Sequence, residues 1–225
     1  MSIAARLAQV RERIDAACRA AGRAPGTVKL VAVSKTKPPE AIREAYASGQ
    51  RAFGENYAQE LAAKAEALAE LLDVEWHFIG HLQTNKAKLV APIAHTVHTV
   101  DTVVLARELG KRAAVARATP LDVLIEVNVG REPQKAGASP GEIQEVVDAV
   151  RAQPSLVLRG LMTVPPAGDP RASRTVFDTL ALLRNLHGGA GALPELSMGM
   201  SDDLEEAIAA GATSVRVGRA IFGDR

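Results

Sequence analysis

The sequence contains a single cysteine, Cys18, so it cannot form an internal disulfide bond. Scarcity of cysteine fits a protein that works in a reducing compartment. The first residues, Met1 to Arg6, carry charge too early to match a secretory signal peptide. We therefore expect a cytoplasmic protein.

Excess charge and long apolar runs are also missing. The formal net charge is +1, which removes the electrostatic argument for a nucleic-acid or acidic-membrane partner. No stretch approaches the ~20 apolar residues that a membrane-spanning helix needs. We expect neither nucleic acid nor a membrane among the partners of this chain.

The chain does contain enough apolar residues for a large core. Of its 225 residues, 47% are hydrophobic and 24% are charged, which are ordinary values for a globular protein. This length lies within the range of one large α/β domain. No linker or low-complexity tract divides the chain, so we expect one domain over residues 1–225.

Short apolar runs alternate with amphipathic helical patterns along most of the chain. The first pattern predicts a helix over residues 3–22, with Cys18 on or beside its apolar stripe as a small core residue. The predicted strands are residues 28–35, 51–56, 75–80, 96–100, 121–129, 157–164, 195–197 and 213–217. Asn56 and Asp101 stand where their side chains can cap the helices that follow.

Strict alternation of strands and helices predicts a parallel sheet with right-handed crossovers. About eight such units in about 200 residues fit a compact α/β fold, the (β/α)₈ barrel of the TIM type, with an additional N-terminal helix. A doubly wound open sheet is the alternative, and it requires fewer strands.

The chain is organised around the apolar run from Val28 to Ser34, which ends at Lys35 and is followed by Pro38 and Pro39. Such a run predicts a strand buried on both faces, with a primary amine where the strand emerges. Burial favours the neutral form of an amine, which is the nucleophile in Schiff-base chemistry. The alternative is that Lys35 covers apolar surface with its stem and keeps its ammonium in solvent.

Glycine-containing turns follow the last two predicted strands. One runs from Ser197 to Ser201 around Gly199, and the other runs from Val217 to Ala220 around Gly218. Loops at these two places in a barrel commonly bind phosphate, because glycine lets backbone N–H groups approach an anion. Opposite a strand-end lysine, the two turns together favour a phosphate site.

Each turn also has a simpler interpretation. Ser201 can cap the next helix, and Asp202 and Asp203 can complement the dipole of that helix. These two carboxylates would also repel a phosphate. Taken singly, each turn favours this structural interpretation.

A lysine and a phosphate site together predict a phosphorylated carbonyl compound held as a Schiff base. Pyridoxal 5'-phosphate is the leading candidate, and an aldolase-type sugar phosphate is the other. Arg216 favours pyridoxal 5'-phosphate. An arginine that faces the pyridine nitrogen can only donate a hydrogen bond to it, so that nitrogen stays unprotonated. Such a ring is a weaker electron sink, which suits binding better than transamination.

Three further polar residues stand outside this constellation. His77 and His81 lie four apart, but on a strand and a turn rather than on one helix face, so we expect no metal site. Lys135 lies in the polar loop of residues 131–140, the segment expected to be most mobile. We interpret Lys135 as a solvated charge, with a functional role as the alternative.

Several motifs, in the right order, resemble the pyridoxal phosphate homeostasis protein family, whose fold is similar to the N-terminal barrel of alanine racemase. The resemblance covers nearly the whole chain. Its motifs are Val31–Thr36, Phe53–Tyr57, Trp76–Gln83, Leu161–Met162, Leu196–Asp203 and Val215–Gly218.

The resemblance implies that pyridoxal 5'-phosphate is the cofactor and that Lys35 carries it as a Schiff base. It implies that Arg216 faces the pyridine nitrogen. It also implies that Asn56 lies beside the ring.

The resemblance further implies a phosphate site. Ser197, Gly199, Gly218 and the backbone of Arg219 are the residues that would hold the phosphate. The family often has a small hydroxyl residue at the last of these positions. Arg219 departs from that pattern, which affects a side-chain role and not a backbone role.

The sequence favours a protein that stores or delivers pyridoxal 5'-phosphate with little or no turnover. The resemblance implies that the second, β-rich domain of alanine racemase and its catalytic tyrosine are missing. Lys35 then serves one face of a substrate, whereas two-base racemisation needs both. The alternatives are a single-domain racemase, a Schiff-base aldolase, and a protein that hands the cofactor to pyridoxal-phosphate-dependent apoenzymes. A monomer and a weak dimer both fit the sequence.

Overall fold

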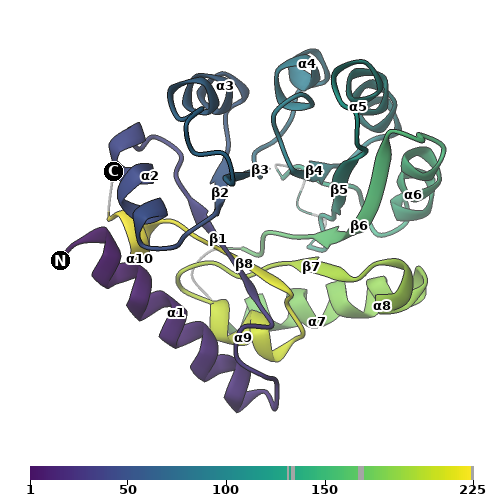
Figure 1. Cartoon of the computed structure of the whole chain (residues 1–225). Helices are drawn as coiled ribbons and strands as arrows, with labels where there is room; N and C mark the ends of the chain where they lie inside the picture. Colours follow the sequence, from purple (N-terminus) through teal and green to yellow (C-terminus); the bar gives the residue numbers. More distant parts are fainter. Residues whose placement is uncertain (131, 133–134, 167–169, 224–225) are drawn as a thin grey trace.

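The computed structural model describes residues 1–130, 132, 135–166 and 170–223 of the 225. Within them, eight parallel strands close into a barrel in which the strands pair in chain order (Figure 1). The strands are β1 (Lys29–Val33), β2 (Ala52–Glu55), β3 (Glu75–Phe78), β4 (Thr96–Val100), β5 (Leu121–Glu126), β6 (Leu156–Met162), β7 (Glu195–Ser197) and β8 (Ser214–Val217). The predicted (β/α)₈ barrel is confirmed.

The first and last strands close the barrel. β1 and β8 pair in parallel, from Lys29 opposite Ser214 to Ala32 opposite Val217. The alternative of an open sheet is wrong, because an open sheet would leave these two strands as edges. β2 and β4 bury every one of their residues, as expected for a parallel sheet covered by helices.

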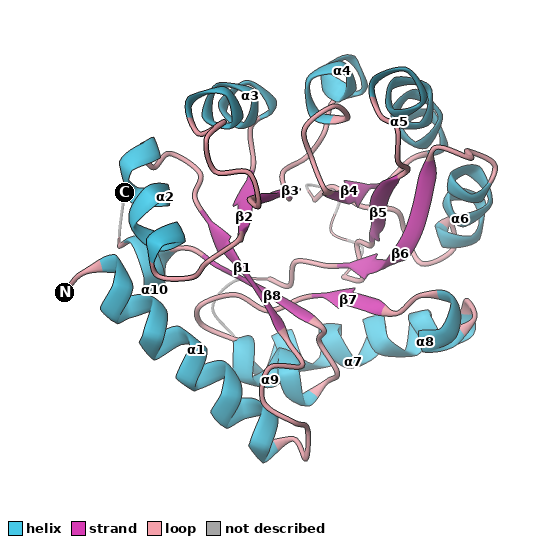
Figure 2. Ribbon diagram, viewed as in Figure 1, coloured by secondary structure: helices cyan, strands magenta, loops and turns pink. Residues whose placement is uncertain are grey.

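Helices surround the barrel on its outside (Figure 2). They are α1 (Ile3–Ala20), α2 (Pro39–Ala47), α3 (Ala58–Ala67), the 3₁₀ turn η1 (Thr84–Lys86), α4 (Ala87–Val90), α5 (Val103–Ala116), α6 (Ile143–Arg151), α7 (Pro170–Leu186), α8 (Gly189–Ala192), α9 (Leu204–Ala209) and α10 (Arg219–Phe222). None of the helices in the described ranges is long and apolar enough to cross a membrane.

The predicted N-terminal helix is α1, which buries Leu7, Val10, Ile14 and Cys18. It packs against α9 and α10, the helices that follow β7 and β8. These two helices are only six and four residues long, so α1 completes the outer layer that they are too short to provide. Cys18 is fully buried there, which confirms it as a core residue.

Two predicted helix caps are wrong. Tyr57, and not Asn56, is the N-cap of α3. Thr102, and not Asp101, caps α5, because its Oγ1 accepts from the Leu105 N–H at 3.2 Å. In both cases the predicted residue stands one position too early, since capping propensity does not determine where the backbone becomes helical.

Several elements are shorter than the apolar pattern predicts. β5 ends at Glu126 and β6 at Met162, although Val127 and Thr163 beyond them are buried. Burial continues past the end of strand pairing, so an apolar run overestimates strand length. α1 likewise ends at Ala20, two residues before the predicted end.

Because all eight strands run in one direction, their carboxyl ends meet at one rim of the barrel. The predicted site residues end or follow β7, β8, β1 and β2. These four strands are consecutive neighbours in the closed barrel. The fold therefore gathers the predicted residues on one side of one rim.

Candidate functional site

The rim at β1 and β8 holds a pocket of about 340 Å³, within the ~300–1,000 Å³ typical of small-molecule sites. Its lining residues are Val33, Lys35, Thr36, Lys37, Gly218, Arg219 and Gly223. The pairing of β1 with β8 brings these distant segments together. The cationic side chains in the lining give the pocket a positive potential that favours an anion.

The backbone directly after Lys35 adopts the left-handed conformation. Thr36 has a φ of 63° and is the only described residue other than glycine with a positive φ. A β-branched residue in this region is strained, and such strain persists where the surroundings hold it. The Thr36 N–H donates to Glu60 Oε1 at 2.6 Å, which holds the turn that directs Lys35.

A buried ion-pair network lies behind this turn. Lys64 Nζ donates to Glu55 Oε1 at 2.8 Å and to Glu60 Oε1 at 2.6 Å. The same amine donates to the Ser34 carbonyl, and Ser34 Oγ donates to Glu55 Oε1, both at 2.6 Å. Burial raises the pKa of Glu55, and the bonds from Lys64 and Ser34 oppose that shift. One lysine therefore ties α3 to the ends of β1 and β2.

Arg216 lies on β8 and is only 4% exposed. Its Nη1 donates to Ser197 Oγ at 2.7 Å, and its Nη2 donates to the Thr163 carbonyl at 2.9 Å. Burial lowers the pKa of Arg216 to about 10, while Glu126 and Asp203 favour its charged form. Arg216 is therefore a cation at neutral pH, with its guanidinium held in one orientation.

The two glycine turns adjoin Arg216. The Gly199 carbonyl accepts from the Arg216 backbone N–H at 2.9 Å, and Gly218 follows Arg216 by two residues. Gly199 has a φ of 95°, and a Cβ there would lie 2.5 Å from the Ala207 Cβ. A Cβ at Gly218 would lie 3.1 Å from the Val33 carbonyl oxygen. Only glycine suits the first turn, and a side chain would crowd the second.

Asp203 closes the turn after β7. Its Oδ1 accepts from the Met200 N–H at 2.7 Å, and Asp203 rather than Ser201 is the N-cap of α9. Asp202 forms an exposed ion pair with Arg219. The carboxylates that could repel a phosphate therefore each have a partner within the protein.

Asn56 follows β2 at the same rim. Its Oδ1 is buried and has no hydrogen-bond partner among the described residues. Its backbone packs so closely against Gly80 that a Cβ at Gly80 would lie 2.1 Å from the Asn56 carbonyl oxygen. Because an unpartnered buried acceptor costs about 1–3 kcal/mol, this amide is a group that a ligand can satisfy.

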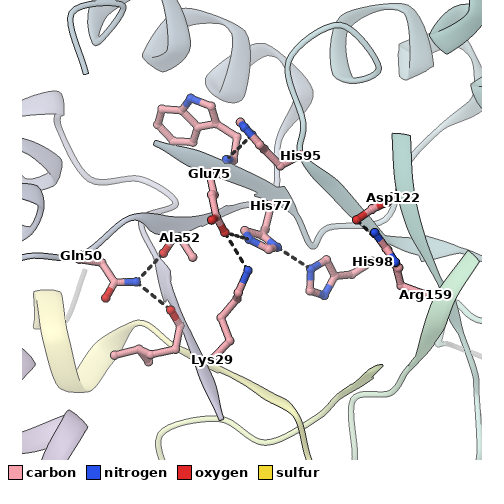
Figure 3. Close-up of polar contacts among 11 residues, drawn as sticks. Lys29, Gln50, Ala52, Glu75, His77, His95, His98, Asp122 and Arg159 are labelled. Carbon is pink, nitrogen blue, oxygen red and sulfur yellow. Dashed lines mark hydrogen bonds and ion pairs between the residues drawn. The ribbon is translucent and has the colours of Figure 1, made fainter. Parts of the chain in front are cut away.

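The interior of the barrel contains two histidines on neighbouring strands (Figure 3). His77 Nδ1 lies 2.9 Å from His98 Nε2, and His98 Nδ1 lies 2.9 Å from Ser197 Oγ. Burial lowers the pKa of both histidines. The sequence does not single out His98. The only feature that could have identified it is a polar residue in the middle of a strand predicted to be buried.

Glu126, at the end of β5, is a second residue that the sequence does not single out. Its Oε2 is buried without a hydrogen-bond partner among the described residues. Burial raises the pKa of Glu126 to about 7, with a further contribution from Asp101 and an opposing one from Arg216. A carboxyl group that titrates near neutrality therefore lies within electrostatic reach of Arg216.

The remaining predicted polar residues are not part of the pocket lining. His81 is exposed, with Nδ1 3.8 Å from Asp101 Oδ2, and the described residues contain no cluster of potential metal ligands. Lys135 forms an ion pair with Glu132 at 2.6 Å. Of the loop predicted to be mobile, residues 131, 133 and 134 lie outside the described residues.

Six of the seven predicted site residues form two groups at one rim, and Asn56 belongs to neither group. The groups are Lys35, Gly218 and Arg219 around the pocket, and Ser197, Gly199 and Arg216 in hydrogen-bond contact. β8 connects the groups, because it carries Arg216 and leads into Gly218. The Ser197 hydroxyl is engaged by Arg216, and its role toward a phosphate stays a prediction.

Residues 6–225 match the family model described as alanine racemase, N-terminal domain. This is the class of barrel protein that the fold and the rim lysine define. Alanine racemase of Clostridium difficile shares the fold, with a TM-score of 0.73 at 13% identity, and the match covers 96% of this chain and 56% of that one.

Two relatives are much more similar. The pyridoxal phosphate homeostasis protein of Pseudomonas aeruginosa is 47% identical over 226 residues, covering 100% of this chain and 96% of that protein. PipY of Synechococcus elongatus, solved with PLP bound, is 37% identical with a TM-score of 0.83, covering 99% of this chain and 100% of that chain. The chain therefore belongs to the family of pyridoxal phosphate homeostasis proteins.

Proposed function

We propose that this protein holds pyridoxal 5'-phosphate as a Schiff base on Lys35 and takes part in its homeostasis and delivery in the cytoplasm, with little or no turnover. The observation that carries the proposal is the pocket that joins Lys35 to the glycine turn after β8. The names of the relatives, and the PLP bound to PipY, support it.

The phosphate would lie at the turn of Gly218 and Arg219. A Cβ at Gly218 would crowd the Val33 carbonyl, so glycine keeps the backbone open to an anion there. Lys37 adds positive charge to the pocket lining, whereas the side-chain charge of Arg219 is compensated by Asp202. The turn around Gly199 would complete the site from β7.

Arg216 and Asn56 would face the ring. Arg216 has no proton acceptor, so it would donate to the pyridine nitrogen and keep it unprotonated. When bound, the cofactor would supply an electrophilic aldehyde carbon, and its ring with an unprotonated nitrogen would stabilise negative charge less well. The unpartnered Oδ1 of Asn56 fits a ligand beside it. This arrangement favours holding the cofactor over carbanion chemistry.

A single-domain amino-acid racemase is the second candidate. One observation favours it: Glu126 has a pKa raised to about 7 by burial, which suits a general base at neutral pH. Incubating holoprotein with L-alanine in D₂O and following the α-proton by NMR separates the two functions. We expect no exchange over hours; exchange that is accompanied by formation of D-alanine and disappears in Glu126→Gln would establish the racemase instead.

The attachment is tested by absorption spectroscopy and by borohydride reduction followed by peptide mass spectrometry. We expect a visible band that is absent in Lys35→Ala, with the reduced pyridoxyl group on the peptide containing Lys35. Lys37→Ala is the matched control: Lys37 lines the same pocket, so its loss can weaken binding, but the cofactor that does bind should still give the band. A parent protein that shows no visible band after addition of pyridoxal 5'-phosphate and removal of the unbound cofactor would exclude the proposal.

Delivery is tested with a pyridoxal-phosphate-dependent apoenzyme as acceptor. If the protein hands over the cofactor by contact, the rate of enzyme reactivation should rise with acceptor concentration. A rate equal to spontaneous dissociation from the holoprotein, at every acceptor concentration, would limit the function to storage.

A further inference from the structure

A line of polar side chains crosses the interior of the barrel from the rim to the opposite end. Arg216 Nη1 donates to Ser197 Oγ at 2.7 Å, and Ser197 Oγ lies 2.9 Å from His98 Nδ1. His98 Nε2 lies 2.9 Å from His77 Nδ1, and His77 Nε2 lies 3.6 Å from Glu75 Oε2 (Figure 3). The function proposed above uses only the rim end of this line.

The two ends of the line have opposite hydrogen-bonding character. Arg216 can only donate. Glu75 can only accept when it is ionised, and its contacts with His77 and Lys29 lower the pKa of Glu75 to about 2. Lys29 Nζ lies 2.8 Å from Glu75 Oε2 at the amino-terminal end of the barrel. The line therefore runs from a fixed donor to a fixed acceptor.

The two histidines between these ends are neutral, because burial lowers the pKa of His77 and lowers that of His98 well below its usual value. A neutral imidazole has one N–H donor and one acceptor nitrogen. Each ring can therefore donate a hydrogen bond to the neighbour on one side and accept one from the neighbour on the other side.

One direction suits these contacts better than the other. His77 Nε2 makes no hydrogen bond within the described residues, and the carboxylate oxygen it faces, Glu75 Oε2, lies 3.6 Å away. If Ser197 donates to His98 Nδ1, then His98 Nε2–H donates to His77 Nδ1, and His77 Nε2–H points to the Glu75 carboxylate. In the reverse direction the Ser197 hydroxyl has no acceptor among its described contacts. The lone pair of His77 Nε2 would also face a carboxylate, which is repulsive. The donors therefore all point from the rim toward Glu75.

We propose, building on the proposed function, that His98 and His77 are positioning residues that lock Ser197 and Arg216 for the pyridine ring. In this arrangement the oxygen lone pairs of Ser197 face the guanidinium. Glu75 sets the direction of the line from the amino-terminal end of the barrel. A half-exposed carboxylate remote from the pocket thereby controls the group that faces the ring.

The first test needs no cofactor. Long-range ¹H–¹⁵N spectra of the apoprotein, labelled on histidine, report which ring nitrogen carries the proton. We expect His77 and His98 both to be neutral and protonated on Nε2 at pH 7 and above. A proton on Nδ1 of either ring would overturn the proposed direction, whether or not the protein binds pyridoxal 5'-phosphate.

The second test uses the holoprotein and measures the rate of cofactor loss together with the position of the visible band. For His98→Leu we expect about fivefold faster loss, the effect of one hydrogen bond, and a shifted band. Glu75→Gln should change both in the same direction by a smaller amount, because an amide can also donate. Unchanged loss and an unchanged band in Glu75→Gln would overturn the positioning role.

Asp122→Asn is the matched control for Glu75→Gln. Asp122, near the start of β5, also forms an ion pair, with Arg159 at 2.9 Å. It does not contact the line of side chains (Figure 3). We expect its band and its rate of cofactor loss to equal those of the parent protein. If Asp122→Asn and Glu75→Gln had equal effects, any charge at the amino-terminal end of the barrel would change the rate of cofactor loss. That result would contradict a role for the histidines. If His98→Leu fails to fold, Glu75→Gln decides, because Glu75 is half exposed.

Discussion

Glu126 shows how the barrel interior changes a single side chain. Its carboxyl group has a raised pKa because the residues around it exclude water and Arg216 compensates only in part. The sequence places this carboxylate in an apolar strand, but it does not show how much water reaches it. A raised pKa in such a group links protein stability to pH.

We expect the free energy of unfolding to fall as the pH rises through the range from about 4.5 to about 7. The folded state then binds the proton more tightly than the unfolded state, so the contribution of Glu126 is complete below this range and lost above it. A shift of this size corresponds to roughly 3 kcal/mol. Denaturant unfolding of the parent and of Glu126→Gln, at pH 5 and pH 8, measures the difference.

The comparison with Glu126→Gln removes the pH dependence that all other groups share. The variant should gain stability relative to the parent as the pH rises. A constant difference between the two proteins from pH 5 to pH 8 would show that Glu126 titrates at its ordinary pKa.

The turn after β7 is an element whose shape requires glycine. Gly199 has a φ of 95°, and a Cβ there would meet Ala207, whereas Gly211 has a φ of 98° with open space around it. We expect Gly199→Ala to destabilise the protein by about 1–3 kcal/mol more than Gly211→Ala, because crowding is added to the same backbone strain. Thermal unfolding of both variants measures this difference, and equal losses would contradict it.

The turn after β1 depends on α3, and the contact is made by Lys64. Removing this amine leaves the buried Glu55 without its cation, so Lys64→Met should destabilise the protein by about 3 kcal/mol or more. Lys88→Met, at an exposed position of α4, should change stability by less than about 0.5 kcal/mol. Denaturant unfolding compares the two. Loss of cofactor should also accelerate in Lys64→Met, because the strained Thr36 turn is then less firmly held.

At the scale of the whole molecule, α1 completes the outer layer of the barrel beside β7, β8 and β1. Leu7 is fully buried in that contact, whereas Leu72 is 93% exposed. We expect Leu7→Ala to lower the free energy of unfolding by about 2–5 kcal/mol and Leu72→Ala by less than about 0.5 kcal/mol. Equilibrium unfolding measures both. A small loss for Leu7→Ala would mean that α1 is dispensable to the barrel.

The sequence by itself determined the eight strands, the added helix and the strand ends that carry the candidate site. Apolar periodicity reports burial along the chain, and alternation of strands with helices permits only parallel pairing. Lys35, Arg216 and the two glycine turns could be predicted because each stands at the carboxyl end of a strand, where a barrel collects its functional groups.

The tertiary structure alone decided which residues act together. Closure of β8 onto β1 joins Gly218 to Lys35 in one pocket. The direction in which side chains face inside the barrel brings His98, on β4, to Ser197, on β7. Local sequence cannot report such contacts, because hydrogen bonds and electrostatic shifts depend on distances and water exclusion between strands far apart in the chain.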